Sequence, residues 1–202
     1  MVLWLAEQPL ILASRSRPRQ MLLAAAGIPL DVRPADLDER RIEGGADSPA
    51  PGAIAAHLAR EKASAVAKLS PGRLTLGADQ TLALDTECFA KPDDRAAAAA
   101  QLRALRGRTH KLHSAIAFVR DSHVLFEHVG VARLTMRVFS DEFLELYLDA
   151  IGDAATASVG GYQVESLGIQ LFERVEGDYF TVLGLPLTEA LAFLRRQGCL
   201  AQ

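Results

Sequence analysis

Near the start of the chain, hydroxyl and guanidinium groups crowd into a single short turn. An apolar run at residues 10–13 enters this turn, and an amphipathic stretch leaves it. The polar residues of the turn are Ser14, Arg15, Ser16, Arg17 and Arg19. A helix that starts here leaves backbone N–H groups unpaired and carries a partial positive charge, which favours a phosphate ligand. The alternative is a solvated basic turn that only caps a helix.

Asp79 is the most conspicuous acid of the sequence, because it stands between two apolar runs, Leu74 to Ala78 and Thr81 to Leu84. These runs are typical of strands, and an aspartate at a strand end can hold a metal ion or orient a water molecule. The alternative is an ordinary turn aspartate in a hairpin. Lys91 precedes Pro92 and is expected near the start of the next helix, where its alternative is a plain surface lysine.

Three further acids and a lysine are candidates for binding a metal ion and phosphate groups. Asp36, Asp38 and Glu39 lie in an acidic loop, and Lys62 lies on the helix that follows it. Carboxylates can hold Mg2+ or Mn2+ and cations can hold phosphates, which is what hydrolysis of a nucleotide phosphoanhydride requires. His110 and His113 are interpreted as structural residues or as residues that support the site without contacting the substrate. The absence of a GxSxG or GxxxxGK[ST] motif argues against an α/β-hydrolase and a P-loop enzyme.

The elements that must position these residues alternate between strands and helices. We expect helices where apolar residues recur at helical spacing and where caps are present, and a β-meander where the pattern alternates. The expected helices span residues 19–26, 51–69, 93–107, 140–151 and 188–194, with Asp93, Ser140 and Thr188 as N-caps; the expected strands span 10–13, 28–32, 74–78, 81–84, 115–120 and 124–138, with a bend at Gly130. This order predicts one α/β domain over residues 1–202, with a mixed, elongated sheet flanked by helices and two lobes around a central cleft.

Composition narrows the class of protein. The chain has 202 residues, half of them apolar, and a formal net charge of −3, so binding to nucleic acid or a membrane by bulk charge is not expected. Cys88 and Cys199 are its cysteines and form no CxxC motif, which argues against a disulfide framework or a structural zinc site. No signal peptide or membrane span is apparent, and a cytoplasmic protein is expected.

Taken together, the motifs of this chain resemble those of the Maf family of nucleoside triphosphate pyrophosphatases over nearly its whole length. The matching pieces are Leu12-Ala-Ser-Arg-Ser16 with Arg19, Asp38-Glu39, Ala59-Arg-Glu-Lys62-Ala63, Gly77-Ala-Asp79, Lys91-Pro92, Gly107-Arg-Thr-His110, and Gly168-Ile-Gln, Val175-Glu-Gly-Asp178 and Val182-Leu-Gly-Leu-Pro186. The resemblance implies a fold related to inosine triphosphate pyrophosphatase. It also implies metal-dependent cleavage between the α and β phosphates, which yields a nucleoside monophosphate and pyrophosphate and clears non-standard nucleotides.

The resemblance assigns roles by position. It implies that Asp79 accepts a proton from the attacking water and that Glu39 is a metal-binding or catalytic carboxylate, with Mg2+ or Mn2+ held by Glu39 and Asp79. Ser14, Ser16, Arg19, Lys62 and Lys91 are the implied phosphate-binding and catalytic set. One departure from the family pattern is the proline, because this chain reads Ser16-Arg17-Pro18-Arg19 and its proline stands one place later. At the position of Pro18, the family members that resemble 7-methyl-GTP enzymes carry tryptophan.

The sequence is compatible with two functions, an enzyme and a nucleotide-binding regulator. A nucleotide-binding regulator of septum formation without turnover would have little use for Asp79 and Glu39, which repel phosphates unless a metal intervenes, so an enzyme is favoured. Gln80 and Glu165 are the implied base-contacting pair and favour 7-methyl-GTP or another modified purine nucleotide. The alternative substrates are dTTP and UTP. The expected ligand is a nucleoside triphosphate rather than a nucleic acid. A homodimer is one possible oligomeric state.

Overall fold

A computed structural model describes residues 3–37 and 50–202 of the chain. The strands are β1 (Leu10–Leu12), β2 (Leu30–Val32), β3 (Leu74–Leu84), β4 (Glu87–Phe89), β5 (Thr109–Arg120), β6 (His123–Met136) and β7 (Phe172–Glu176). The α-helices are α1 (Arg17–Ala25), α3 (Pro51–Ala67), α4 (Arg95–Leu105), α5 (Asp141–Ile151), α6 (Tyr179–Val182) and α7 (Leu187–Arg196). Three short 3-10 helices, η1 (Gly152–Thr156), η2 (Val159–Gly161) and η3 (Leu167–Leu171), lie between α5 and β7.

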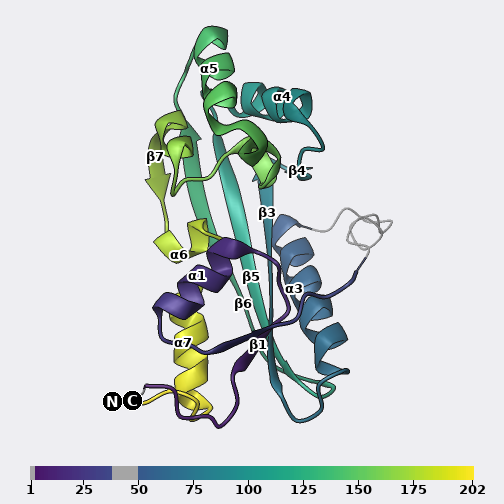
Figure 1. The fold of residues 1–202 in the computed structure, drawn as a ribbon. Helices are drawn as coiled ribbons and strands as arrows, with labels where there is room; N and C mark the ends of the chain where they lie inside the picture. The colour runs from purple at the N-terminus through teal and green to yellow at the C-terminus, as the bar shows by residue number, and fades with distance from the viewer. Residues whose placement is uncertain (1–2, 38–49) are drawn as a thin grey trace.

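The strands form one mixed seven-stranded sheet. Six of them have the order β2-β1-β3-β5-β6-β7, and the seventh, β4, pairs with β3. β1 is parallel to both β2 and β3, whereas the remaining pairs are antiparallel. β3, β5 and β6 are the long strands and run through the length of the molecule (Figure 1). The expected mixed, elongated sheet flanked by helices is confirmed.

Two hydrophobic clusters lie toward opposite ends of the long strands. One contains residues of β1, α1 and α7, and the other contains residues of α4 and α5. β3 contributes Leu76 to the first cluster and Leu82 to the second, while β5 contributes Phe118 to the first and Leu112 to the second. Figure 1 shows these two lobes, with α4, α5 and β7 above and α1, α7 and α3 below. The middle of each long strand therefore lies between the two cores.

Several expected helix starts are wrong by a residue or two. Asp94 rather than Asp93 caps α4, because its side chain accepts a hydrogen bond from the Ala97 N–H at 2.7 Å. Pro186 occupies the N-cap of α7, so Thr188 lies inside the helix. Ser140 caps α5 as expected. Local sequence marks these starts only approximately, since neighbouring polar residues can compete for the same cap.

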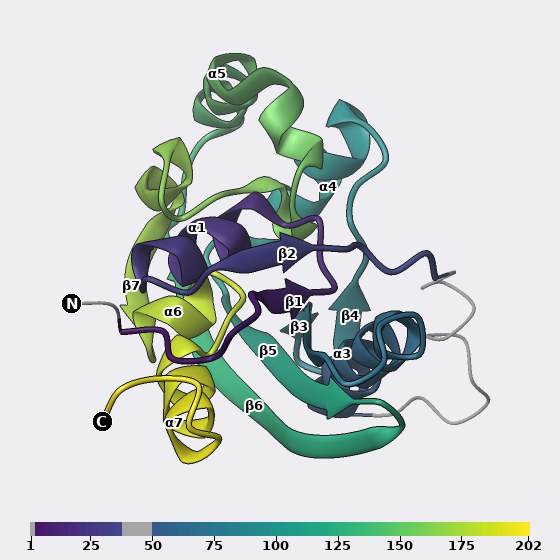
Figure 2. The same cartoon turned by 60° about the horizontal axis from the view of Figure 1, so that its bottom comes forward.

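Gly130 lies inside β6 and pairs with Ser114 rather than marking a break in the ladder. A side chain at this position would bring its Cβ to 2.7 Å from the Thr181 Oγ1 of α6. The irregularities in the β6 pairings lie elsewhere, opposite Phe118/Val119 of β5 and at Thr135/Met136. The glycine thus allows α6 to pack closely against the sheet. Figure 2 shows α6 against this part of the sheet.

No helix in the described part of the chain combines the length and the apolar character needed to cross a lipid bilayer.

Candidate active site

A cleft between the lobes consists of two adjoining cavities of about 620 and 790 Å³. The two cavities share part of their lining: Ser16, Arg19, Gln80, Lys91, Ala157, Ser158 and Val159. The first cavity also includes Ser14, Lys62 and Glu165, and the second includes Asp79. Every candidate site residue within residues 3–37 and 50–202 therefore lines this one cleft.

The serine and arginine turn lies between β1 and α1. Ser16 is the N-cap of α1, and Pro18 occupies the first helical turn, where a proline costs no intrahelical hydrogen bond. The displaced proline thus leaves the helix start intact. The Oγ of Ser14 accepts hydrogen bonds from the Ser16 N–H at 3.3 Å and from Arg19 Nη1 at 3.2 Å. Its own hydroxyl hydrogen remains for a ligand at the helix start.

Arg19 is only 9% exposed, and its guanidinium connects three segments. Its Nε donates to the Gly184 carbonyl at 2.8 Å, and its Nη1 donates to the Ala78 carbonyl at 2.8 Å as well as to Ser14. These contacts join α1, β3 and the turn after α6. A charge held by several acceptors keeps its orientation, so the positive group is fixed before any ligand arrives.

Asp79 lies in the middle of β3, so the expectation of two short strands around an aspartate turn is wrong. β3 pairs continuously with β5 from Leu74 to Ala83, with Asp79 opposite Ala115. Gly77 is required on this strand because a Cβ there would lie 2.0 Å from the Ala59 carbonyl oxygen of α3. The small residue permits close contact between helix and strand.

This close contact places Lys62 of α3 against Asp79. Lys62 Nζ donates to Asp79 Oδ1 at 2.7 Å, and the two residues are 9% and 7% exposed. An ion pair this deeply buried is costly to desolvate and adds little to stability compared with an apolar pair. Its presence beside a cavity is typical of a functional site.

Gln80, the next residue on β3, lies in a network that sequence inspection missed. Its Nε2 lies 2.9 Å from Ser114 Oγ and 3.2 and 3.1 Å from the carbonyl oxygens of Thr181 and Val182. Ser114 is fully buried and donates to the Thr181 carbonyl at 2.7 Å. The available signal was a serine directly before the apolar run at residues 115–119 of β5.

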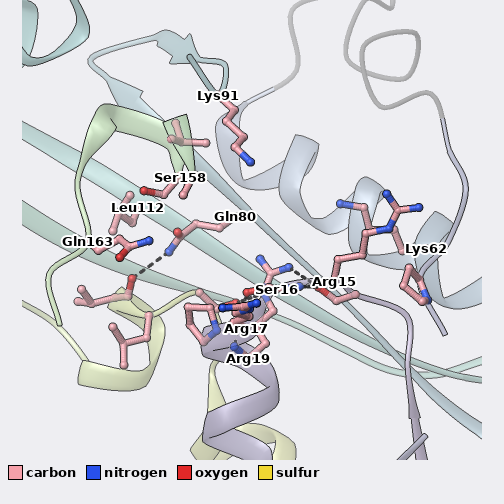
Figure 3. Close-up of a pocket in the computed structure, with 18 of the residues that line it drawn as sticks. Arg15, Ser16, Arg17, Arg19, Lys62, Gln80, Lys91, Leu112, Ser158 and Gln163 are labelled. Atoms are coloured by element: carbon pink, nitrogen blue, oxygen red, sulfur yellow. Dashed lines mark hydrogen bonds between the residues drawn. The ribbon is translucent and has the colours of Figure 1, made fainter. Parts of the chain in front are cut away.

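Lys91 and Glu165 approach the cleft from the other lobe. Lys91 follows β4, Glu165 lies in the turn between η2 and η3, and both side chains are exposed. Figure 3 shows Lys91 reaching toward the pocket from the edge opposite Arg17 and Arg19. The cleft is thus cationic on two sides, although its two lobes hold their charges very differently.

Glu39 and Asp38 lie outside the described residues, so the structure does not place them. Asp36 is exposed and lines the first cavity. Among the residues that are described, no group of three or more His, Cys, Asp or Glu side chains gathers to form a metal site. Asp79 therefore has to be considered by itself as a metal ligand, with its Oδ1 already accepting from Lys62.

His110 lies behind the cleft, as its structural interpretation predicts. It is fully buried, and its Nε2 lies 2.6 Å from the hydroxyl of Tyr162, a residue that lines the first cavity. Burial lowers the pKa of His110 to about 4 and raises that of Tyr162 above its ordinary value. Burial and the charge of Lys111 lower the pKa of His113, which lies beside Gly52 of α3.

A family model described as "Maf-like protein" matches residues 9–197. The nucleoside triphosphate pyrophosphatase of Rhodopseudomonas palustris is 58% identical over 201 residues, which cover 100% of both chains. The 7-methyl-GTP pyrophosphatase of Rhizobium etli is 48% identical over 191 residues, 94% of this chain and 96% of its own. The crystal structure of a nucleoside-triphosphatase / dITP/XTP pyrophosphatase from Mycobacterium abscessus matches with a TM-score of 0.42 and 14% identity, over 95% of each chain.

Proposed function

The chain belongs to the Maf-like family, and from this membership and the geometry of the cleft we propose that it is a nucleoside triphosphate pyrophosphatase. The reaction is hydrolysis of a nucleoside triphosphate between its α and β phosphates. Water supplies the oxygen, and the products are a nucleoside monophosphate, pyrophosphate and one proton. Curated relatives at 58% and 48% identity bear the names of pyrophosphatases of this kind, which supports the proposal.

The buried Lys62–Asp79 pair beside a cationic helix start carries the proposal. A protein that only bound a nucleotide would have no use for a buried carboxylate beside the phosphates, since the like charges repel. A hydrolase has such a use, because the carboxylate can take the proton of an attacking water. Lys62 holds Asp79 Oδ1 at 2.7 Å, which leaves the second carboxylate oxygen for the water.

The remaining cations bind the triphosphate. The Ser14 hydroxyl, the start of α1 and the buried Arg19 line one side of the cleft together with Lys62, and Lys91 approaches from the other lobe. Several charges from separate segments suit a ligand that itself carries several charges. They also stabilise the additional negative charge that develops on the phosphate oxygens as the bond to the leaving pyrophosphate breaks.

A divalent cation, Mg2+ or Mn2+, is part of this proposal. Mg2+ is usually held by one or two carboxylates together with substrate phosphates, and Asp79 at the cleft wall fits that pattern. When bound there, the metal would neutralise phosphate charge and lower the pKa of a coordinated water. Glu39 is the second carboxylate proposed for it.

The base is proposed to be 7-methylguanine or another modified purine. Glu165 lines the first cavity, and a carboxylate can accept two parallel hydrogen bonds from the N1–H and N2 amino groups of guanine. It would also attract the positive charge of a methylated ring. The relative named 7-methyl-GTP pyrophosphatase supports this choice. Removal of such nucleotides would limit their incorporation into nucleic acids.

The experiment is to measure pyrophosphate release with Mg2+ or Mn2+ across GTP, 7-methyl-GTP, dITP, UTP and dTTP. We expect turnover with pyrophosphate as product, and the highest kcat/KM for 7-methyl-GTP. A preference for UTP and dTTP would overturn the base assignment and leave the reaction in place. Tight nucleotide binding without any product would instead support a regulator that lacks turnover.

A further inference from the structure

The side-chain amide of Gln80 is held by three acceptors from two other segments of the chain. Its Nε2 contacts the Ser114 hydroxyl on β5 and the carbonyl oxygens of Thr181 and Val182 in α6, all within 3.2 Å. The dashed line that starts at Gln80 in Figure 3 connects this nitrogen to a carbonyl oxygen beneath it. Gln80 also lines both cavities, so the same amide belongs to the cleft and to the interior.

The chemistry of these partners fixes which end of the amide faces inward. A carbonyl oxygen can only accept a hydrogen bond, so two carbonyls at this distance require the NH2 group of Gln80. A rotated amide would place Oε1 against both carbonyl oxygens. Ser114 donates its own hydrogen to Thr181 at 2.7 Å, so its lone pairs face Gln80. The NH2 group has two hydrogens for its three acceptors, and the Ser114 contact is the shortest at 2.9 Å, so the hydroxyl contributes most closely to this orientation.

We propose that Ser114 is a positioning residue that locks Gln80 with Oε1, an acceptor, toward the nucleotide base. The proposal rests on the proposed function and deepens it. None of the described residues donates a hydrogen bond to Oε1, which leaves this oxygen for a ligand. A base that offers an N–H or an amino group is then preferred at this position, and one that offers a carbonyl oxygen is disfavoured.

The packing around α6 maintains the lock. The Asp178 carboxylate caps this short helix by accepting from the Thr181 N–H at 2.7 Å, and Gly130 lets Thr181 approach the sheet. The turn after α6 supplies the Gly184 carbonyl to Arg19. The same segment thus orients both the amide that faces the base and the guanidinium that faces the phosphates.

The test compares Ser114→Ala with the native protein in kcat/KM on GTP, 7-methyl-GTP and UTP. Uracil offers one ring N–H between two carbonyl oxygens, whereas guanine offers an N–H and an adjacent amino group, so an acceptor favours guanine. Loss of one neutral hydrogen bond to Gln80 should therefore reduce the ratio of purine to UTP efficiency about fivefold. Ser140→Ala is the control, because it removes a serine hydroxyl that caps α5 and does not line the cleft. It should lower stability without changing the ratio. An unchanged ratio in Ser114→Ala would overturn the positioning role.

A second measurement does not depend on catalysis. In protein labelled with 15N-glutamine, the side-chain NH2 protons of Gln80 should exchange slowly with solvent and should exchange faster in Ser114→Ala. Rapid exchange in the native protein would overturn the lock whether or not the protein hydrolyses nucleotides. If none of GTP, 7-methyl-GTP, dITP, UTP and dTTP yields pyrophosphate, the proposed function is wrong. The exchange data would still decide the orientation of the Gln80 amide.

Discussion

The two walls of the cleft differ in how firmly they hold their charged groups. The inner wall, formed by β1, α1, α3 and β3, carries Ser14, Arg19, Lys62 and Asp79, all of them buried. The outer wall carries Lys91 and Glu165 on connecting segments, and both are exposed. Buried, hydrogen-bonded groups are fixed before substrate binds, whereas exposed groups on loops can adapt. From this difference we expect the buried groups of the inner wall to carry the reaction, and Glu165 on the outer wall to select the nucleotide together with Gln80 of β3.

The most severe test of the inner wall is Asp79→Asn. The amide keeps the shape and an acceptor for Lys62 but cannot take a proton from water, so kcat should fall roughly 100-fold or more. Asp85→Asn is the matched control, since Asp85 lies at the end of the same strand in an exposed ion pair with Arg108. Steady-state pyrophosphate release measures both. Near-normal turnover in Asp79→Asn would remove this residue from the mechanism.

The stability of the protein at acidic pH tests the support of the outer wall. Tyr162 lies just before the turn that carries Glu165, and its hydroxyl forms a hydrogen bond with buried His110. The pKa of His110 is about 4 in the fold and 6.5 when solvated. Below pH 6.5 the unfolded chain binds a proton that the folded chain rejects, so the free energy of unfolding falls between pH 6.5 and 4. This histidine alone contributes a loss of roughly 3 kcal/mol.

Urea unfolding at pH 7 and pH 4.5 measures this effect. His110→Gln can still bond to Tyr162 but does not titrate, so its stability should change less over the same pH interval. Parallel pH profiles for the two proteins would show that His110 is not the group responsible, and that the acid sensitivity arises from the carboxylates.

Arg19→Ala tests whether burial gives the inner wall its strength. A charge-assisted hydrogen bond in a closed site is worth about 2 kcal/mol, so kcat/KM should fall about 30-fold, whereas loss of a solvated arginine has little effect. Arg195 on α7 is exposed and provides the comparison. Equal kinetics for Arg19→Ala and Arg195→Ala would mean that the phosphate site has been misplaced.

The smallest expected effect belongs to the outer wall. Glu165→Gln replaces a carboxylate by an amide of the same size and should reduce the preference for 7-methyl-GTP over UTP about fivefold, with kcat on the better substrate little changed. Measuring kcat/KM for GTP, 7-methyl-GTP, UTP and dTTP in both proteins checks this. If the ranking of the bases is unaffected, Glu165 does not contact the base.

The sequence alone predicted most of the fold because its strands and helices are strongly patterned. The buried run at β1, the capped helix after Ser140 and the meander that contains β5 and β6 all appear close to their expected positions. Boundaries were less accurate at α4 and α7, where neighbouring residues compete for the cap. The mixed sheet could be predicted because strands alternate with helices early in the chain, which favours parallel pairs, and follow one another directly later, which favours antiparallel pairs.

Residue types and their order along the chain determined which side chains are chemically able to bind phosphate and activate water. The tertiary structure decided which of these side chains contact one another. Gly77 lies in a run that the sequence marks only as a strand, whereas the structure shows that α3 packs on this glycine and that the contact brings Lys62 to Asp79. Ser114 shows no motif at all, and its role depends on α6, more than sixty residues later, packing beside β5. Such contacts come from long-range packing, which local sequence patterns do not encode.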